Sequence, residues 1–248
     1  MDATTQGGRS AEIRDKVKER YGAAISSGGS CCGKTDETLS IQPAQGSRQA
    51  RTSFGCGDPL AVVPLAPGDV VVDIGSGPGA DAFAAARAVG PTGRVFGIDM
   101  TPAMLEAARR NAREADLPNV EFREGDAERL PLPDGTANWV ISNCVINLVP
   151  DKQAAFKEIS RVLKPGGRIS ISDLVGENLP EEILADGDKF CECIGGAPSE
   201  IEYLDAIRSA GLEEIRIEDR FEWPVPELEG TTGRVWSLRI TARRPLAI

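Results

Sequence analysis

The chain has 248 residues, of which 41% are hydrophobic and 27% charged, and 38 acidic against 28 basic residues give a formal net charge of −10. This composition is typical of a globular protein with a sizeable core, and the acidic excess argues against nucleic acid or an anionic membrane as the main partner. The chain contains no histidine, which excludes histidine-based acid–base catalysis and every metal site that needs an imidazole ligand.

The first part of the chain predicts one short helix followed by loops. Ile13, Val17 and Tyr21 recur every four residues, which predicts a helix over residues 10–21. Residues 22–60 are rich in Gly, Ser and Gln and show little periodicity, so we expect loops and short turns there.

An alternation of strand and helix patterns begins at Asp69. The patterns predict strands at 70–72, 94–99, 120–123, 139–142 and 169–174, and helices at 80–89, from Pro102 behind a Thr101 cap, and at 151–163 before a Pro-Gly-Gly stop. Such an alternation packs as a parallel sheet with helices on both faces. The rhythm then changes, because a capping box at Ser199 opens a helix that stops at Gly211, and residues 215–219 and 235–242 indicate two late strands.

The sequence therefore predicts an α/β fold with a doubly wound, mostly parallel sheet of seven strands. We expect three parts: an N-terminal helix with Cys-containing loops (1–60), a cofactor-binding domain (61–176) and a C-terminal region with the late strands (177–248). No apolar run is long enough to span a membrane and the first thirty residues are polar, so we expect no membrane partner, no signal peptide and a cytoplasmic location.

A glycine-rich loop follows the first strand of the alternation. It reads Asp73-Ile74-Gly75-Ser76-Gly77-Pro78-Gly79, a G-x-G-x-G spacing that differs from the G-x-G-x-x-G of dinucleotide-binding proteins. Glycines let the backbone approach a ligand closely, and the free N–H groups of the next helix favour an anionic group. Asp99 ends the second strand, about where an acidic residue binds a ribose diol in such folds. The alternative is a tight turn with solvated acids, but the glycines and acids together favour a cofactor site.

This loop resembles the first motif of the S-adenosylmethionine-dependent methyltransferases. The resemblance implies that S-adenosylmethionine is the cofactor, and that Asp126 is the acidic residue near its adenine. The cofactor-binding residues that we expect on this basis are Asp73, Gly75, Ser76, Gly77, Gly79, Asp99, Met100, Asp126, Ala127 and Asn143.

A second glycine-rich segment, Gly28 to Thr35, fits the phosphate-binding pattern G-x-x-x-x-G-K-[ST]. A working loop of this kind needs a buried strand before it and a helix after it. Neither pattern is present, so a nucleotide triphosphatase is disfavoured.

Six cysteines remain to be explained: Cys31, Cys32, Cys56, Cys144, Cys191 and Cys193. Five of them fall in Gly-rich or polar stretches, where we expect no core to bury them. A disulfide framework is unusual in a chain of this size without an export signal, and zinc would need C-x-x-C pairs that the sequence lacks. Thiolates select soft centres, and three converging cysteines would complete the shell of trivalent arsenic. Cys144 directly follows the fourth strand, at the sheet edge where ligands bind in doubly wound folds.

From about residue 12 to 210 the chain resembles the arsenite methyltransferases. The motifs that carry the resemblance are Ser30-Cys31-Cys32-Gly33, Phe54-Gly55-Cys56-Gly57, Ser142-Asn143-Cys144-Val145-Ile146-Asn147-Leu148 and Cys193-Ile194-Gly195-Gly196-Ala197. The resemblance implies that Cys144 and Cys193 are the principal thiolates for the arsenic(III) substrate and Cys56 the third. It also implies thiol–disulfide exchange between Cys56 and either Cys31 or Cys32, while a Cys191–Cys193 chelate stays a competing geometry.

The expected substrate is thus arsenite or one of its thiol adducts, methylated as a detoxification, with thioredoxin or glutathione as reductant. Trivalent arsenic already offers a lone pair, so this reaction needs no general base and the missing histidine is no obstacle. Two alternatives stay open: a small-molecule methyltransferase with another acceptor, and a thiol-based binding protein for arsenic or another soft metal.

Overall fold

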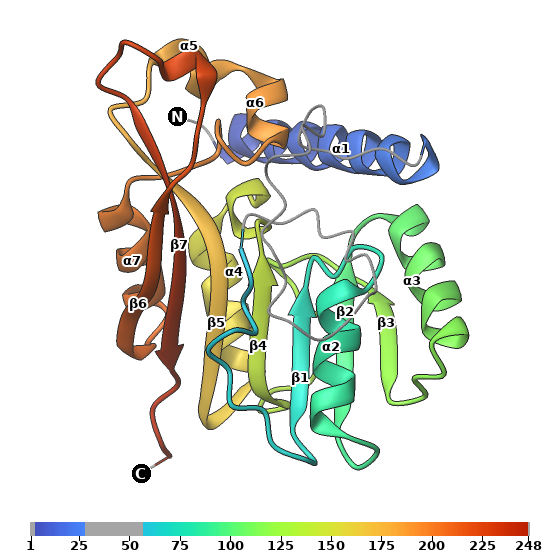
Figure 1. Cartoon of the computed structure of the whole chain (residues 1–248). Helices are drawn as coiled ribbons and strands as arrows, with labels where there is room; N and C mark the ends of the chain where they lie inside the picture. The colour runs from blue at the N-terminus through green and yellow to red at the C-terminus, as the bar shows by residue number, and fades with distance from the viewer. Residues whose placement is uncertain (1–2, 28–56, 248) are drawn as a thin grey trace.

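The structure of the chain, a computed structural model, describes residues 3–27 and 57–247. Its centre is a seven-stranded sheet with the strand order β3-β2-β1-β4-β5-β7-β6 (Figure 1). Neighbouring strands pair in parallel except at β7, which runs antiparallel to both β5 and β6. The strands are β1 (Val70–Ile74), β2 (Arg94–Asp99), β3 (Val120–Glu124), β4 (Ala137–Asn143), β5 (Leu163–Glu177), β6 (Glu213–Glu222) and β7 (Arg234–Arg243). The predicted mostly parallel sheet of seven strands is confirmed.

Helices cover both faces of this sheet. Successive side chains of a strand point to opposite faces, so Val71 and Val72 of β1, both fully buried, belong to different layers. Val71 packs with α2 (Ala80–Val89) and α3 (Pro102–Glu114). Val72 packs on the other face with α4 (Lys152–Val162) and α7 (Glu200–Ser209). A strand that is buried on both faces reads as a continuous apolar run, which is why β1 was evident from sequence.

Two of the predicted helix starts are present. Thr101 is the N-cap of α3 and Pro102 its first residue, although the Thr101 side chain makes no capping hydrogen bond. Ser199 and Glu202 form the reciprocal capping box of α7. The capping box fixes where α7 begins because it satisfies backbone N–H groups that have no partner inside the helix, whereas Pro102 suits the start of α3 because it has no N–H to satisfy.

A third apolar cluster lies beyond the carboxyl ends of the parallel strands. The long helix α1 (Ala3–Ser27) and three short helical elements surround it: η1 (Ile146–Leu148), α5 (Glu181–Ala185) and α6 (Gly187–Cys191) (Figure 1). A further short helix, η2 (Pro226–Leu228), lies in the connection from β6 to β7. Its buried members are Val17, Cys144, Leu148, Leu174, Ile183, Cys191, Cys193, Ile194, Ala197, Val225, Leu228 and Val235.

This cluster corrects one sequence expectation. Five of the six cysteines were expected in stretches that no core would bury, but Cys191 and Cys193 are only 0% and 2% exposed. The reason is tertiary, because α1 and the β6–β7 connection close over the loops from outside the sheet, and no local pattern announces such a cover.

Several element bounds differ from the sequence prediction, and two helices were missed. Helix α1 runs to Ser27, so residues 22–27 are helical and not loop. Helix α4 ends at Val162, close to the predicted end, but β5 begins at Leu163, so Pro165 lies within this strand and not in a loop before it. Helices α5 and α6 were not predicted, because five residues are too few for a periodic signal.

Two sequence predictions are not tested by the described residues. The predicted loops between 28 and 56, with the phosphate-loop pattern, Cys31, Cys32 and Cys56, lie outside the described residues. The three-part division of the chain stays a prediction. None of the helices in the described part has the length and apolar character needed to cross a membrane.

Candidate active site

The glycine loop between β1 and α2 takes the conformation that its sequence requires. Gly75, Gly77 and Gly79 all have positive φ, at 68°, 51° and 102°. A Cβ on Gly75 would overlap the side chain of Val145, so this glycine lets the loop after β4 pack closely. A Cβ on Gly77 would meet nothing within 4 Å, so the backbone there borders open space. Gly75 thus serves packing, and Gly77 leaves room for a ligand.

Two carboxyl groups lie beside this loop, that of the buried Asp73 and that of the half-buried Asp99. Asp99, at the end of β2, accepts hydrogen bonds from the backbone N–H of Gly77 at 2.9 Å and of Thr101 at 2.8 Å. Burial raises the pKa of Asp99, although these hydrogen bonds lower it. Burial raises the pKa of Asp73 well above its usual range, and the nearby carboxylates of Asp81 and Asp99 add to the effect.

A cleft opens between the carboxyl ends of β1, β2 and β4, with about 1030 Å³ of space between protein atoms, part of it open to solvent. Of the ten residues expected to bind the cofactor, nine line it: Asp73, Gly75, Ser76, Gly77, Asp99, Met100, Asp126, Ala127 and Asn143. Gly79 does not, because it is the N-cap of α2, where its missing Cβ makes room for the Phe83 ring. The spacing of glycines and acids therefore predicted a set of residues that meet in one cleft.

Helix α1 covers one side of the cleft, a role that the sequence did not indicate. Arg14, Val17 and Tyr21 all line the cleft. The Nε of Arg14 pairs with Oδ2 of Asp126 at 2.8 Å, and its Nη2 pairs with Glu128. The four-residue spacing of Val17 and Tyr21 signalled an apolar helix face, but not the surface that it covers.

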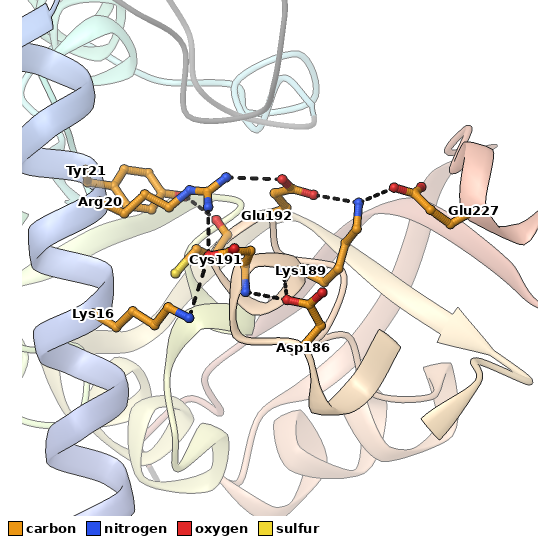
Figure 2. Close-up of polar contacts among 9 residues, drawn as sticks. Lys16, Arg20, Tyr21, Asp186, Lys189, Cys191, Glu192 and Glu227 are labelled. Carbon is orange, nitrogen blue, oxygen red and sulfur yellow. Dashed lines mark hydrogen bonds and ion pairs between the residues drawn. The ribbon is translucent and has the colours of Figure 1, made fainter. Parts of the chain in front are cut away.

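The same helix is joined to α6 by polar contacts (Figure 2). Arg20 pairs with Glu192 at 3.1 Å, and Lys16 and Arg20 both approach Oδ1 of Asp188, at 3.6 and 3.4 Å. The Tyr21 hydroxyl donates to the backbone carbonyl of Cys191 at 3.3 Å. Exposed ion pairs stabilise little individually, but together they orient α1 over the segment that carries two cysteines.

That segment continues the ionic contacts away from α1. Lys189 of α6 pairs with Glu192 at 3.1 Å and with Glu227 of η2 at 2.6 Å (Figure 2). These carboxylates raise the pKa of Lys189. The contacts tie α1, α6 and the β6–β7 connection into one cover over the carboxyl edge of the sheet.

Two cysteines meet beneath this cover. The Cys193 thiol donates a hydrogen bond to the backbone carbonyl of Cys144, with 3.1 Å between sulfur and oxygen. Cys144 lines the cleft, whereas Cys193 lies behind it in the third apolar cluster. Both residues have positive φ, 55° for Cys144 and 65° for Cys193, a conformation that is strained for residues other than glycine.

Cys191 differs from this pair. It is a free, fully buried cysteine at the end of α6, and Figure 2 shows its sulfur on the side that faces α1. Burial raises the pKa of its thiol. The structure thus places Cys191 in the same cluster as Cys193, but Cys191 does not itself line the cleft.

Cys31, Cys32 and Cys56 lie outside the described residues, but the residue that follows Cys56 has a defined place. The Gly57 N–H donates to Oδ1 of Asn143 at 3.2 Å, and Nδ2 of Asn143 donates to the Gly57 carbonyl at 2.8 Å. Gly57 therefore lies beside the residue that precedes Cys144. Within residues 3–27 and 57–247, no three His, Cys, Asp or Glu side chains form a group that could hold a metal ion.

Comparison with known proteins decides the family. Residues 65–215 match the family described as "Methyltransferase domain". The chain belongs to the methyltransferase domain family. The cofactor of this methyltransferase is S-adenosylmethionine. The cleft suits a ligand of this kind, because the side-chain Oδ2 of Asp73 and Oγ of Ser76 are buried in its lining and have no hydrogen-bond partner among the described residues.

Individual relatives give the methyltransferase a narrower resemblance. It is 40% identical over 238 residues to the arsenite methyltransferase of Halobacterium salinarum, covering 85% of this chain and 60% of that protein. It is 34% identical to the arsenite methyltransferase of Aquipseudomonas alcaligenes, covering 75% of this chain and 58% of that protein. The crystal structure of an arsenic(III) S-adenosylmethionine methyltransferase from Chlamydomonas reinhardtii matches with a TM-score of 0.69 and 34% identity, over 77% of this chain and 68% of the other. The methyltransferase thus spans about 60% of the length of these two curated relatives.

Proposed function

We propose that the methyltransferase transfers the methyl group of S-adenosylmethionine to trivalent arsenic held by thiolates of Cys144 and Cys193, with Cys56 as the third ligand. The observation that carries the proposal is the hydrogen bond from the Cys193 thiol to the Cys144 carbonyl at the edge of the cofactor cleft. The similarity to two arsenite methyltransferases supports it.

The cofactor is assigned to the residues of the cleft. Gly75, Ser76 and Gly77 would hold it through backbone and hydroxyl groups, and Asp99 would bind its ribose. Asp126 would face the adenine, in the place where its carboxylate now pairs with Arg14. Met100, Ala127 and Asn143 complete the lining, and Asp73 places a buried carboxyl group beneath the loop. When bound, S-adenosylmethionine supplies a methyl group on a cationic sulfur.

The cysteines do the remaining work on the substrate. Arsenous acid exchanges its hydroxyl groups for the cysteine sulfurs: each new As–S bond replaces one As–O bond, and the thiol proton leaves with the departing hydroxyl group as one water molecule. Arsenic(III) keeps its lone pair through this exchange and then uses it as the nucleophile: an As–C bond forms while the bond from the methyl carbon to the sulfonium breaks, and the electron pair of the broken bond stays on the departing sulfur. The site supplies no general base and needs none, because no proton leaves the arsenic atom when a carbon bond forms.

Burial of the cysteines favours this chemistry. Cys144 and Cys193 are 7% and 2% exposed, and α1 and α6 shield them from solvent. A site without water protects the bound arsenic from exchange with water. It also holds the reacting atoms in place, and such positioning supplies most of the rate acceleration of a displacement reaction. Arsenous acid is uncharged near neutral pH, so a net charge of −10 does not repel it.

The N-terminal cysteines are assigned to redox chemistry. A disulfide between Cys56 and either Cys31 or Cys32 would be reduced by thiol–disulfide exchange with thioredoxin or glutathione. A mass-spectrometric map of the oxidised protein tests this assignment, which fails if that bridge never forms. Because the arsenic thiols must stay reduced, we infer a cytoplasmic location.

The decisive experiment is incubation of the protein with methyl-labelled S-adenosylmethionine, arsenite and a thiol reductant, followed by separation of the arsenic species. We expect the label in methylated arsenicals, formed only when cofactor, arsenite and reductant are all present. Label that never reaches arsenic would contradict the proposal. Tight arsenite binding without label transfer would instead show a thiol-based binding protein, and label in another acceptor a different small-molecule methyltransferase.

A further inference from the structure

The two cysteines come from loops that are far apart in sequence. The Cys144 loop (residues 144–148) follows β4, and the Cys193 loop (residues 193–197) follows α6. Cys144 and Cys193 are 49 positions apart, so their relative placement depends on contacts between the loops. A chelate of a small three-coordinate atom tolerates little change in the distance between its sulfur ligands.

Asn147 joins the two loops from within the first of them. Its Nδ2 donates to the carbonyl of Cys193 at 3.2 Å and to the carbonyl of Leu174 on β5 at 2.6 Å. The Asn147 side chain therefore bridges the Cys144 loop, the Cys193 loop and the central sheet. It is fully buried, so water does not compete for these hydrogen bonds.

The backbone of Asn147 is held as firmly as its side chain. Its N–H donates to Oδ2 of Asp173 at 3.1 Å, and its carbonyl accepts from Nζ of Lys152 at 3.3 Å. A Cβ on Gly196 would overlap the same carbonyl, so the Cys193 loop can approach Asn147 only with glycine there. Oδ2 of Asp173 also accepts from the Tyr203 hydroxyl at 3.1 Å, which fixes the carboxylate itself.

The asparagine amide has one orientation that its surroundings allow. Both groups that face Nδ2 are carbonyl oxygens, so a rotated amide would place oxygen against oxygen. In the observed orientation Oδ1 is buried and has no hydrogen-bond partner among the described residues. A buried unpaired acceptor destabilises the folded state, a cost that the two hydrogen bonds donated by Nδ2 offset. The asparagine is explained by what its amide holds in place.

The backbone strain at both cysteines also indicates that contacts between the two loops hold them in place. The positive φ of Cys144 and Cys193 persists only if the surrounding structure fixes it. The Cys144 N–H donates to the Ser172 carbonyl of β5 at 2.8 Å, and the Cys193 carbonyl is the group that Asn147 binds. Without the Asn147 amide, the Cys193 loop would lose its link to the sheet on the side of Cys144.

We propose that Asn147 is a positioning residue that fixes the separation of the Cys144 and Cys193 sulfur atoms, with Asp173 and Tyr203 holding it from below. The inference rests on the proposed function in taking these sulfur atoms as the arsenic ligands. Asn147 does not line the cleft, and none of its hydrogen bonds is to a sulfur atom. Its effect is on how well two thiols converge.

The test measures convergence of the thiols without methylation. Phenylarsine oxide binds two neighbouring thiols: its As=O bond is replaced by two As–S bonds, and the two thiol protons leave with the oxygen as one water molecule. The background protein has Cys31, Cys32, Cys56 and Cys191 replaced by Ser and is kept reduced with a phosphine. Affinity is read from the dithiol concentration that removes half of the bound arsenical.

We expect the background protein to bind one equivalent of phenylarsine oxide, and Asn147→Ala to weaken binding at least about tenfold. Tyr203→Phe keeps the ring that packs edge-on against Phe156 and should weaken binding less. Ile159→Ala, which truncates a buried residue of the other core on α4, is the control for general destabilisation and should leave binding within about twofold. In the protein with all its cysteines, Asn147→Ala should raise the KM for arsenite while the KM for S-adenosylmethionine stays within about twofold.

Equal binding by Asn147→Ala and the background protein would overturn the inference, as would an equal loss in Ile159→Ala. If Asn147→Ala does not fold, Asn147→Ser and Tyr203→Phe decide by the same criterion. If the wild-type protein binds phenylarsine oxide through the two thiols but never methylates arsenite, the proposed function fails and the positioning role of Asn147 stands.

Discussion

The Cys193 thiol lies 3.1 Å from the backbone carbonyl oxygen of Cys144, to which it donates a hydrogen bond. One cysteine follows the fourth strand and the other follows a short helix, yet both take the same left-handed backbone conformation. Cys144 also lines the cleft that the glycine loop forms. One cysteine thus lies in the wall of this cleft, and the second is hydrogen-bonded to its backbone from behind.

Replacement of Cys144 or Cys193 by Ser should reduce arsenite methylation about 100-fold or more, because a hydroxyl group is a poor ligand for arsenic. The affinity for S-adenosylmethionine, measured by calorimetry, should change by no more than about threefold. Cys191→Ser is the matched control, since Cys191 is also buried but does not line the cleft, and it should keep most of the activity. Full activity of the Cys144 and Cys193 variants would refute the role of the thiolates.

Gly77→Ala should weaken S-adenosylmethionine binding about tenfold, because the new methyl group enters the open space of the cleft. Gly135→Ala is the matched control: Gly135 also has positive φ and open space around it, but it does not line the cleft. Each substitution should lower the free energy of unfolding by about 1 kcal/mol through backbone strain. Loss of cofactor affinity in both variants, or in neither, would show that Gly77 has no part in binding.

Arg14→Ala should speed the dissociation of S-adenosylmethionine about tenfold, because Arg14 ties α1 to Asp126 and Glu128 at the cleft. Lys16→Ala, which removes a charge from the same helix on its exposed pair with Asp188, should leave dissociation unchanged. Stopped-flow displacement gives both rates. The free energy of unfolding should fall by less than about 1 kcal/mol in either variant. Equal dissociation rates in the wild type and Arg14→Ala would mean that α1 does not retain the cofactor.

Asp173 should make stability depend on pH between about 4 and 7. Burial raises the pKa of Asp173 from 3.8 to about 6, against the lowering by the hydrogen bonds that the carboxylate accepts and by Lys152. In this window the folded protein keeps a proton that the unfolded chain has released, so the stabilisation is present at low pH and is lost as the pH rises. Relative to Asp173→Asn, the wild type should lose about 3 kcal/mol of unfolding free energy across the window. Urea unfolding at a series of pH values measures the difference, and parallel curves would contradict the assignment.

The sheet and the cleft could be predicted from sequence because their signals are local. Val70 to Val72 form an apolar run of a strand buried on both faces, and the G-x-G-x-G spacing needs only a strand before it and a helix after it. The cysteine site could be predicted in part: Cys144 follows a strand end, but only the resemblance to the arsenite methyltransferases, and no local pattern, implied that Cys193 would meet it.

Other parts of the site depend on long-range packing. Arg14 reaches Asp126 and Glu128 across more than a hundred positions, and Val17 packs in the cluster of the cysteines, so the covering role of α1 has no local signature. Asn147 reads as an ordinary polar residue after a strand, and only the fold shows that its amide bridges the two cysteine loops. Sequence indicates which residues carry chemistry more readily than it indicates which residues place them.

The most direct test of the account is the arsenic K-edge X-ray absorption spectrum of the reduced protein with one equivalent of arsenite. We predict a coordination shell of sulfur atoms only in the wild type and in Cys191→Ser, with an oxygen neighbour replacing sulfur in Cys144→Ser and in Cys193→Ser. An unchanged spectrum in the last two variants, or arsenic surrounded by oxygen in the wild type, would contradict it.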